Sequence, residues 1–160
     1  MSTATLTATL RPMLPSDADA VAEIFREAIL VGTAADYTEE QRIAWAGPKL
    51  DPERWRDRIG ISVGLIAERG GKPVGCMTLM EGNHLDMAFV RPEATGTGVG
   101  GLLLSSLTMI ARAGGARAIT SDVSITARPF FERYGFKVVK DQVRIRRGVE
   151  LPNFAMRKDL

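Results

Sequence analysis

The strongest structural signal in the chain is the segment Val90-Arg91-Pro92-Glu93-Ala94-Thr95-Gly96-Thr97-Gly98-Val99-Gly100-Gly101-Leu102-Leu103-Leu104. An apolar segment runs into closely spaced glycines, and an apolar helix is expected after them. Glycine lets the main chain adopt positive φ and approach a ligand closely. The first N–H groups of a helix and its positive dipole end attract anions. The stretch therefore predicts a turn that holds a phosphorylated cofactor.

Two well-known phosphate-binding motifs compete for these glycines. A nucleoside-triphosphate P-loop ends in Gly-Lys-Ser/Thr, whereas leucines follow the glycines here. The dinucleotide spacing G-x-G-x-x-G is met by Gly96, Gly98 and Gly101, with Asp122 about 20 residues further on as a ribose-binding acid. A Rossmann turn follows its strand directly, however, whereas five residues separate Val90 from the first glycine. The 59 residues after Gly101 are also too few for a second nucleotide-binding half.

A third motif matches more of the chain. The loop Thr95-Gly96-Thr97-Gly98-Val99-Gly100 resembles the pyrophosphate loop of the GNAT N-acetyltransferase superfamily, whose signature is Gln/Arg-x-x-Gly-x-Gly/Ala. Thr95 stands where the family has Gln or Arg, so a cation is lost from the loop. We expect Arg91 or Arg128 to supply it.

A second block strengthens the resemblance. Ser124-Ile125-Thr126-Ala127-Arg128-Pro129-Phe130-Phe131-Glu132-Arg133-Tyr134-Gly135-Phe136 is similar to the family segment Asn-x-x-Ala-x-x-Phe-Tyr-x-x-x-Gly-Phe. Ser124 replaces the Asn and Phe131 replaces the Tyr. In the family this helix flanks the pantetheine and thiol end of the cofactor. The resemblance is strong over Leu65 to Leu160 and general over the first 60 residues.

The resemblance implies a fold and a cofactor. The fold is mixed α/β, with a mostly antiparallel sheet of about six to seven strands and about four flanking helices. Its two central parallel strands splay apart, and they match Leu85–Val90 and Ala118–Val123 here. The implied cofactor is acetyl-CoA, lying in that gap. The implied cofactor-binding residues are Ala88, Phe89, Val90, Thr95, Gly96, Thr97, Gly98, Val99, Gly100, Gly101, Ser124 and Phe131; Ser124 has helix capping as its alternative role.

The implied chemistry is acyl transfer from CoA to a primary amine of a small molecule or peptide. The amine must lose a proton before it attacks, so a carboxylate or histidine is needed as base. Asp86 is the leading candidate, because the strand that carries it resembles the family's catalytic strand. Strand alternation predicts that Asp86, Ala88 and Val90 share one face, together with His84, the only histidine. The structural alternatives are a salt-bridged Asp86 and a His84 bonded to the backbone.

The acid that protonates the departing thiolate is a separate question. Phe131 cannot donate a proton. Tyr134 lies three residues later on the same helical face and is the candidate acid. It could instead be an aromatic plug at the helix end, and water could protonate the thiolate.

The acceptor site is expected beside the first two helices. Tyr37 and Trp45 are the candidate substrate-binding residues, through ring packing or cation–π attraction to an ammonium group. Trp55 fits better as a core anchor. Cys76 is expected to be a buried strand residue rather than a nucleophile.

Composition agrees with one folded domain, residues 1–160. The net charge of +2 is too small to predict nucleic-acid binding, and no apolar run is long enough to predict a membrane span. The N-terminal segment has no secretory signal pattern, so a cytoplasmic protein is expected. Cys76 is the only cysteine, which excludes an intramolecular disulfide and disfavours a thiolate metal site; no metal is expected. Arg144 and Arg146 are expected to be solvated or to contribute to a homodimer contact.

Periodicity and capping signals predict the elements. An apolar stripe at helical spacing from Val21 to Ile29 predicts a helix, begun by a capping box at Ser16–Asp19. A second capping box joins Thr38 to Gln41, and residues 38–60 are predicted to form one broken helix or two short ones. Further helices are expected at Val99–Ala113 and Ala127–Tyr134. The predicted strands are 4–11, 61–68, 74–80, 84–90, 116–123, 136–140, 143–147 and 154–158.

Two other functional classes stay open. A non-catalytic acyl-CoA sensor on the same fold would explain Phe131 at the tyrosine position. A nicotinamide-dependent oxidoreductase would bind NAD and not CoA. Neither accounts for both motif blocks as well as an acyltransferase does.

Overall fold

A computed structural model describes residues 7–160. They form one seven-stranded sheet in the order β1-β2-β3-β4-β5-β7-β6, in which every neighbouring pair is antiparallel except β4 and β5. The predicted mixed fold class is confirmed. The strands are β1 Thr9–Pro12, β2 Val63–Arg69, β3 Lys72–Met80, β4 His84–Val90, β5 Ala118–Ser124, β6 Lys137–Arg146 and β7 Val149–Asp159.

Five α-helices and two short 3-10 turns connect the strands in the described residues. About four helices were expected, and the difference arises because residues 38–60 form two separate helices. Each face of the sheet is covered by its own cluster of buried side chains. One joins α1 and α3 to residues such as Cys76 and Met87, and the other joins α4 and α5 to residues such as Leu85 and Ile119. The helices are α1 Ala18–Leu30, α2 Glu39–Ala46, α3 Glu53–Gly60, α4 Val99–Ala113 and α5 Arg128–Arg133, with 3-10 turns η1 Pro15–Asp17 and η2 Pro92–Ala94.

The capping signals have mixed outcomes. The Thr38 capping box is confirmed, since Thr38 Oγ1 accepts the Gln41 N–H at 3.1 Å and Gln41 Oε1 accepts the Thr38 N–H at 2.9 Å. The box predicted at Ser16–Asp19 is wrong. The carboxylate of Asp17 instead accepts the Leu14 N–H at 2.8 Å and pairs with the guanidinium group of Arg11 at 2.8 Å. Asp17 therefore ties β1 to η1 and begins the 3-10 turn rather than α1.

The ends of the sheet differ from the predicted strands. The first strand covers Thr9–Pro12, and residues 4–6 of the prediction lie outside the described part of the chain. The last three predicted segments form one long hairpin of β6 and β7. Its turn is Arg147-Gly148, and both residues have positive φ, 49° and 76°, as a tight hairpin turn requires. A bulge leaves Val139 unpaired in β6.

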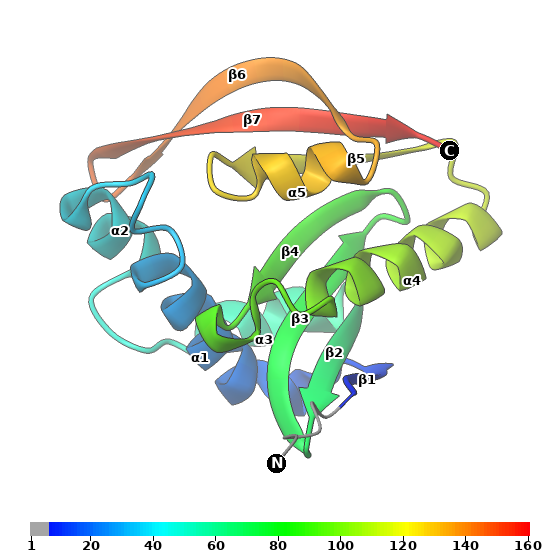
Figure 1. Cartoon of the computed structure of the whole chain (residues 1–160). Helices are drawn as coiled ribbons and strands as arrows, with labels where there is room; N and C mark the ends of the chain where they lie inside the picture. The colour runs from blue at the N-terminus through cyan, green and yellow to red at the C-terminus, as the bar shows by residue number, and fades with distance from the viewer. Residues whose placement is uncertain (1–6) are drawn as a thin grey trace, which may run out of the picture.

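The predicted splaying of β4 and β5 is confirmed. The two parallel strands pair only at their beginnings, His84 with Thr120 and Leu85 with Ser121. Beyond these pairs the sheet divides into two halves. Figure 1 shows β5, β7 and β6 above and β1 to β4 below, with β4 turning away from β5. The carboxyl end of β4 then leads through η2 into the glycine loop before α4.

Candidate active site

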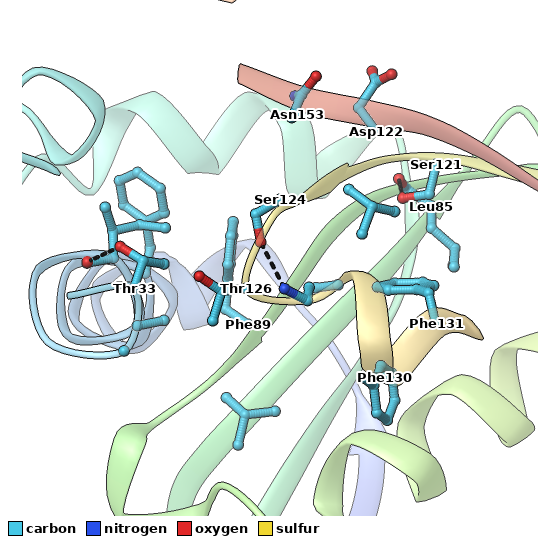
Figure 2. Close-up of a pocket in the computed structure, with 18 of the residues that line it drawn as sticks. Thr33, Leu85, Phe89, Ser121, Asp122, Ser124, Thr126, Phe130, Phe131 and Asn153 are labelled. Carbon is cyan, nitrogen blue, oxygen red and sulfur yellow. Dashed lines mark hydrogen bonds between the residues drawn. The ribbon is translucent and has the colours of Figure 1, made fainter. Parts of the chain in front are cut away.

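A cleft of about 1260 Å³ occupies the gap between the two halves of the sheet. Its walls come from both sides: from α1, α2 and α3, and from the glycine loop, α4 and α5. Figure 2 looks into this cleft, with Phe130 and Phe131 of α5 on the right and Thr33, which follows α1 in the chain, on the left. The cleft therefore runs between the two halves of the sheet, where β4 and β5 separate.

The glycine loop forms one end of the cleft. Gly96 and Gly98 have φ of 78° and 91°, a conformation that side-chain-bearing residues rarely adopt, and open space lies where their side chains would be. The first intrahelical bond of α4 runs from the Leu102 N–H to the Gly98 carbonyl at 3.0 Å. The N–H groups of residues 99–101 precede it, so they face the loop and can bind an anion.

Neither arginine expected beside the loop is directed at it. Arg91 is buried; its Nε donates to the Pro73 carbonyl at 2.8 Å and its Nη1 lies 3.1 Å from the Glu27 carboxylate. Arg128 pairs with Glu132 of its own helix. Arg69, at the end of β2, instead donates from Nη2 to the Thr97 hydroxyl at 3.0 Å. That prediction is therefore wrong for both residues, because each already has partners elsewhere, and Arg69 is the cation beside the loop.

The α5 helix packs on the first turn of α4. The ring of Phe130 lies against Gly100, and the hydroxyl of Tyr134 occupies the space that a Cβ on residue 101 would need. Phe131 is buried, with its ring centroid 5.1 Å from that of Phe136. Tyr134 thus lines the cleft close to the glycine loop, whereas Phe131 belongs mostly to the core.

Ser124 lies at the end of β5, where the chain turns into α5. Its hydroxyl accepts the N–H of Ala127 at 3.0 Å, the contact drawn as a dashed line in Figure 2. This geometry is that of a serine that begins a helical turn. Ser124 also lines the cleft.

The predicted alternation along β4 is wrong. A bulge interrupts the pairing of β3 with β4: Thr78 pairs with Met87 and Leu79 with Leu85, which leaves Asp86 without a partner in β3. Asp86 reaches α3, and the next residue, Met87, lies in the same α1–α3 cluster. Ala88 and Val90 pack against the opposite, α4 cluster.

The bulge therefore separates the two groups that alternation places together. A β-bulge inserts one residue, so side chains beyond it move to the other face. The carboxylate of Asp86 faces the α3 side of the sheet, and the Ala88 and Val90 side chains face the α4 side.

Asp86 is held by an arginine that the sequence analysis did not connect with it. Nη2 of Arg58 lies 2.7 Å from both carboxylate oxygens of Asp86, and Nε lies 3.1 Å from Oδ2. His84, two residues earlier, has its Nδ1 2.8 Å from the Thr120 hydroxyl of β5. Both His84 and Asp86 line the cleft.

The expected acceptor residues lie at the α1–α2 end of the cleft. The Tyr37 hydroxyl donates to the Pro152 carbonyl at 2.6 Å and accepts the Ile125 N–H at 3.0 Å. Burial raises the pKa of Tyr37. Trp45 packs edge-on against Tyr37 at 5.2 Å. The Tyr37 hydroxyl therefore ties this end of the cleft to β7, and the two rings contribute apolar surface to it.

Three aromatic rings form part of the cleft wall next to α3. The rings of Phe25, Trp55 and Phe89 meet edge to face at 4.7 to 5.8 Å. Trp55 is only 2% exposed and lies in the α1–α3 cluster, so it is a core anchor, as the sequence analysis favoured. The guanidinium group of Arg54 lies 4.7 Å from the Trp55 ring centroid and 4.8 Å from that of Phe25.

The sequence analysis did not single out Arg54, Arg58 and Asn153, which line the cleft, or Arg69, which contacts the glycine loop. The Oδ1 of Asn153 and the Nε of Arg69 are buried without a hydrogen-bond partner among residues 7–160. No local sequence pattern distinguishes Asn153 and Arg69 from the other polar residues of their strands. The one usable signal was Arg54 and Arg58 themselves, four residues apart and therefore on one face of a short helix.

Comparison with known proteins explains the arrangement. Residues 33–160 match the acetyltransferase (GNAT) domain. The chain belongs to the GNAT acetyltransferase family. A relative described as the uncharacterized N-acetyltransferase YafP of Escherichia coli (strain K12) is 37% identical over 148 residues, which cover 92% of this chain and 93% of that protein.

Solved GNAT structures share the architecture. A GCN5-related N-acetyltransferase from Rhodopseudomonas palustris is 37% identical, with full coverage of both chains and a TM-score of 0.92. The PaiA N-acetyltransferase from Thermoplasma acidophilum, solved in complex with coenzyme A, is 21% identical and covers 97% of this chain and 100% of its own, with a TM-score of 0.77. The second likeness concerns the fold alone.

No helix in residues 7–160 is long and apolar enough to cross a membrane. In the described part of the chain, no three or more His, Cys, Asp and Glu side chains come together where they would hold a metal ion.

Proposed function

We propose that this GNAT protein transfers an acetyl group from acetyl-CoA to a primary amine by direct attack in a ternary complex. One observation carries the proposal: a single cleft joins the glycine loop to the Asp86 side of the sheet through the gap between β4 and β5. Two reactants entering from opposite ends would meet there. Family membership supports the transfer of an acetyl group.

The cofactor end of the cleft fits a pyrophosphate. Positive φ at Gly96 and Gly98 leaves open space beside the loop, and the N–H groups that open α4 point into it. In our proposal Arg69 adds the cation that Thr95 does not supply, and the main chain of Ala88 to Val90 binds the pantetheine arm. The bound thioester would supply an acyl carbon in the gap between the strands.

The chain's own residues would manage the protons. Asp86 accepts the proton of the acceptor ammonium, directly or through water, while Arg58 holds its carboxylate in place. His84 is the alternative base. The hydroxyl of Tyr134 would donate a proton to the departing sulfur, since Phe131 cannot do so. The nitrogen–carbon bond would form and the carbon–sulfur bond would break, and the second proton lost by the nitrogen would restore the Tyr134 hydroxyl, directly or through water.

The test is CoA release from acetyl-CoA in the presence of primary amines, followed with a thiol reagent. We expect amine-dependent turnover that falls by about 100-fold or more in Asp86→Asn, the usual contribution of a general base. The matched control is Asp57→Asn, an exposed carboxylate on α3 that does not line the cleft. Tight acetyl-CoA binding without turnover of any amine would favour the sensor alternative, which the phenylalanine at position 131 supports.

A further inference from the structure

The charges around the cleft are unbalanced. Five arginines and two aspartates among the described residues line it. Both aspartates are paired: Asp86 lies 2.7 Å from Arg58, and Asp122 lies 3.0 Å from Arg144. Arg54 and Arg146 face the same cleft, and neither forms an ion pair within residues 7–160. The side chains that line the cleft therefore carry net positive charge.

Of Arg54 and Arg146, only Arg54 is half-buried. It is stacked over Phe25 and Trp55, and it makes no hydrogen bond to any described residue. Burial, followed by the positive charges of Arg146, Arg58 and Arg147, lowers the pKa of Arg54. A half-buried charge without a partner is unfavourable, and a bound anion would relieve the cost.

Arg54 lies close to the proposed base, Asp86, because Arg58 is its neighbour on α3. Arg54 and Arg58 are four residues apart and both lie over Trp55, so they occupy one face of α3, about 6 Å apart along the helix axis. Arg58 holds Asp86, the proposed base. An anion at Arg54 would therefore leave an amine a few bonds away close to Asp86.

We propose that the acceptor is a small primary amine that also carries a carboxylate or phosphate group, which binds the guanidinium group of Arg54. This inference rests on the proposed function and names the substrate class for the same site. The aromatic wall of Phe25, Trp55 and Phe89 would hold the apolar part of the acceptor. The second cation, Arg146, contributes attraction at longer range.

The test compares amines that differ only in the anion. The pairs are L-phenylalanine with 2-phenylethylamine, L-leucine with 3-methylbutylamine, and O-phosphoethanolamine with ethanolamine. The first two pairs test a carboxylate and the third tests a phosphate. We expect kcat/KM at least about 10-fold higher for the anionic member of one class, the usual effect of one hydrogen bond to a charged group.

Arg54→Met removes the charge and keeps an apolar stem over the rings. We expect it to abolish the preference through a higher KM for the anionic member, with the KM for acetyl-CoA unchanged, and Arg54→Lys to restore part of it. Arg56→Met is the matched control, because Arg56 pairs with Glu53 and lies outside the cleft. Equal or better turnover of the neutral members, or a preference that survives in Arg54→Met, would overturn the inference.

A second measurement does not need turnover. Trp45 and Trp55 are the only tryptophans and both line the cleft, so their fluorescence reports on it. We titrate the acetyl-CoA-saturated protein with inorganic phosphate against potassium chloride at equal ionic strength. A saturable phosphate response that Arg54→Met abolishes and Arg56→Met keeps supports the inference, and its absence contradicts it. Failure to turn over any amine would count against the proposed function, while this titration still decides the anion site.

Discussion

The guanidinium group of Arg58 binds both carboxylate oxygens of Asp86, with Nη2 2.7 Å from each of them. The two residues lie 28 positions apart, on α3 and β4. Asp86 is the residue that the bulge leaves without a partner in β3, and its carboxylate faces α3, whereas Ala88 and Val90 beyond the bulge face α4. Charge-assisted contacts of this kind fix the orientation of a carboxylate.

The first prediction follows from this pair. Arg58→Met should leave Asp86 in the cleft without a fixed orientation, and we expect kcat to fall by about 10-fold while the KM for acetyl-CoA stays constant. Arg58→Lys should recover part of the rate, since one donor is kept. Initial rates measured over a range of pH give kcat and its pH profile for both variants. An unchanged kcat and an unchanged pH profile in Arg58→Met would show that Asp86 needs no positioning.

The second prediction concerns the contact of α5 with α4. Gly101→Ala places a methyl group where the Tyr134 hydroxyl lies, and overpacking of this kind costs about 1–3 kcal/mol. Tyr134→Phe removes the hydroxyl, so the double variant should lose less stability than the sum of the two single variants. Urea unfolding of the four proteins measures this coupling. Strict additivity would mean that Tyr134 does not rest on Gly101.

The third prediction concerns the cation at the glycine loop. Arg69→Met should weaken acetyl-CoA binding by about 10-fold, because the loop has lost its other cation at Thr95. Arg128→Met is the control, since Arg128 pairs with Glu132 and stacks 4.6 Å from the Phe154 ring centroid. Isothermal titration with acetyl-CoA compares them. Equal weakening by both variants would indicate a general charge effect rather than a local contact.

The fourth prediction concerns Cys76. Burial raises the pKa of its thiol from the ordinary 9.0 to about 12. The native protein should therefore not react with dithionitrobenzoate at pH 8, and one thiol should appear after unfolding in guanidinium chloride. Because the pKa is raised in the folded state, this thiol favours folding below pH 9, and that contribution is lost as the pH rises toward 12. Rapid reaction of the native protein would place Cys76 at the surface.

The sequence predicted the parts of the fold that local chemistry determines. The predicted strand His84–Val90 and helix Val99–Ala113 agree with β4 and α4 at both ends. The strand is a mostly apolar run, and a pair of glycines ends the helix. The glycine loop was recognisable for the same reason. Its phosphate-binding property lies in the backbone, which glycine spacing reports directly.

The parts that failed depend on contacts between distant segments. The bulge at Asp86 reverses the alternation of β4 without any signal in the local pattern, since Thr78 of β3 takes part in it: its hydroxyl accepts the Met87 N–H at 3.0 Å. The partners of Arg91 are Pro73 and Glu27, which no spacing rule connects. Contacts between side chains on distant segments could therefore not be predicted from the sequence.

The most direct test of the account is titration of the protein with acetyl-CoA by isothermal calorimetry, comparing Gly98→Glu with Gly115→Glu. Both glycines have positive φ, 91° and 92°, with open space beside them, and they lie at opposite ends of α4. The two variants therefore carry the same backbone strain and charge, but only Gly98→Glu puts a carboxylate in the proposed phosphate site. We predict saturable binding to the natural protein and to Gly115→Glu, and none to Gly98→Glu. Equal binding by both variants, or binding of NAD in place of acetyl-CoA by the natural protein, would contradict the account.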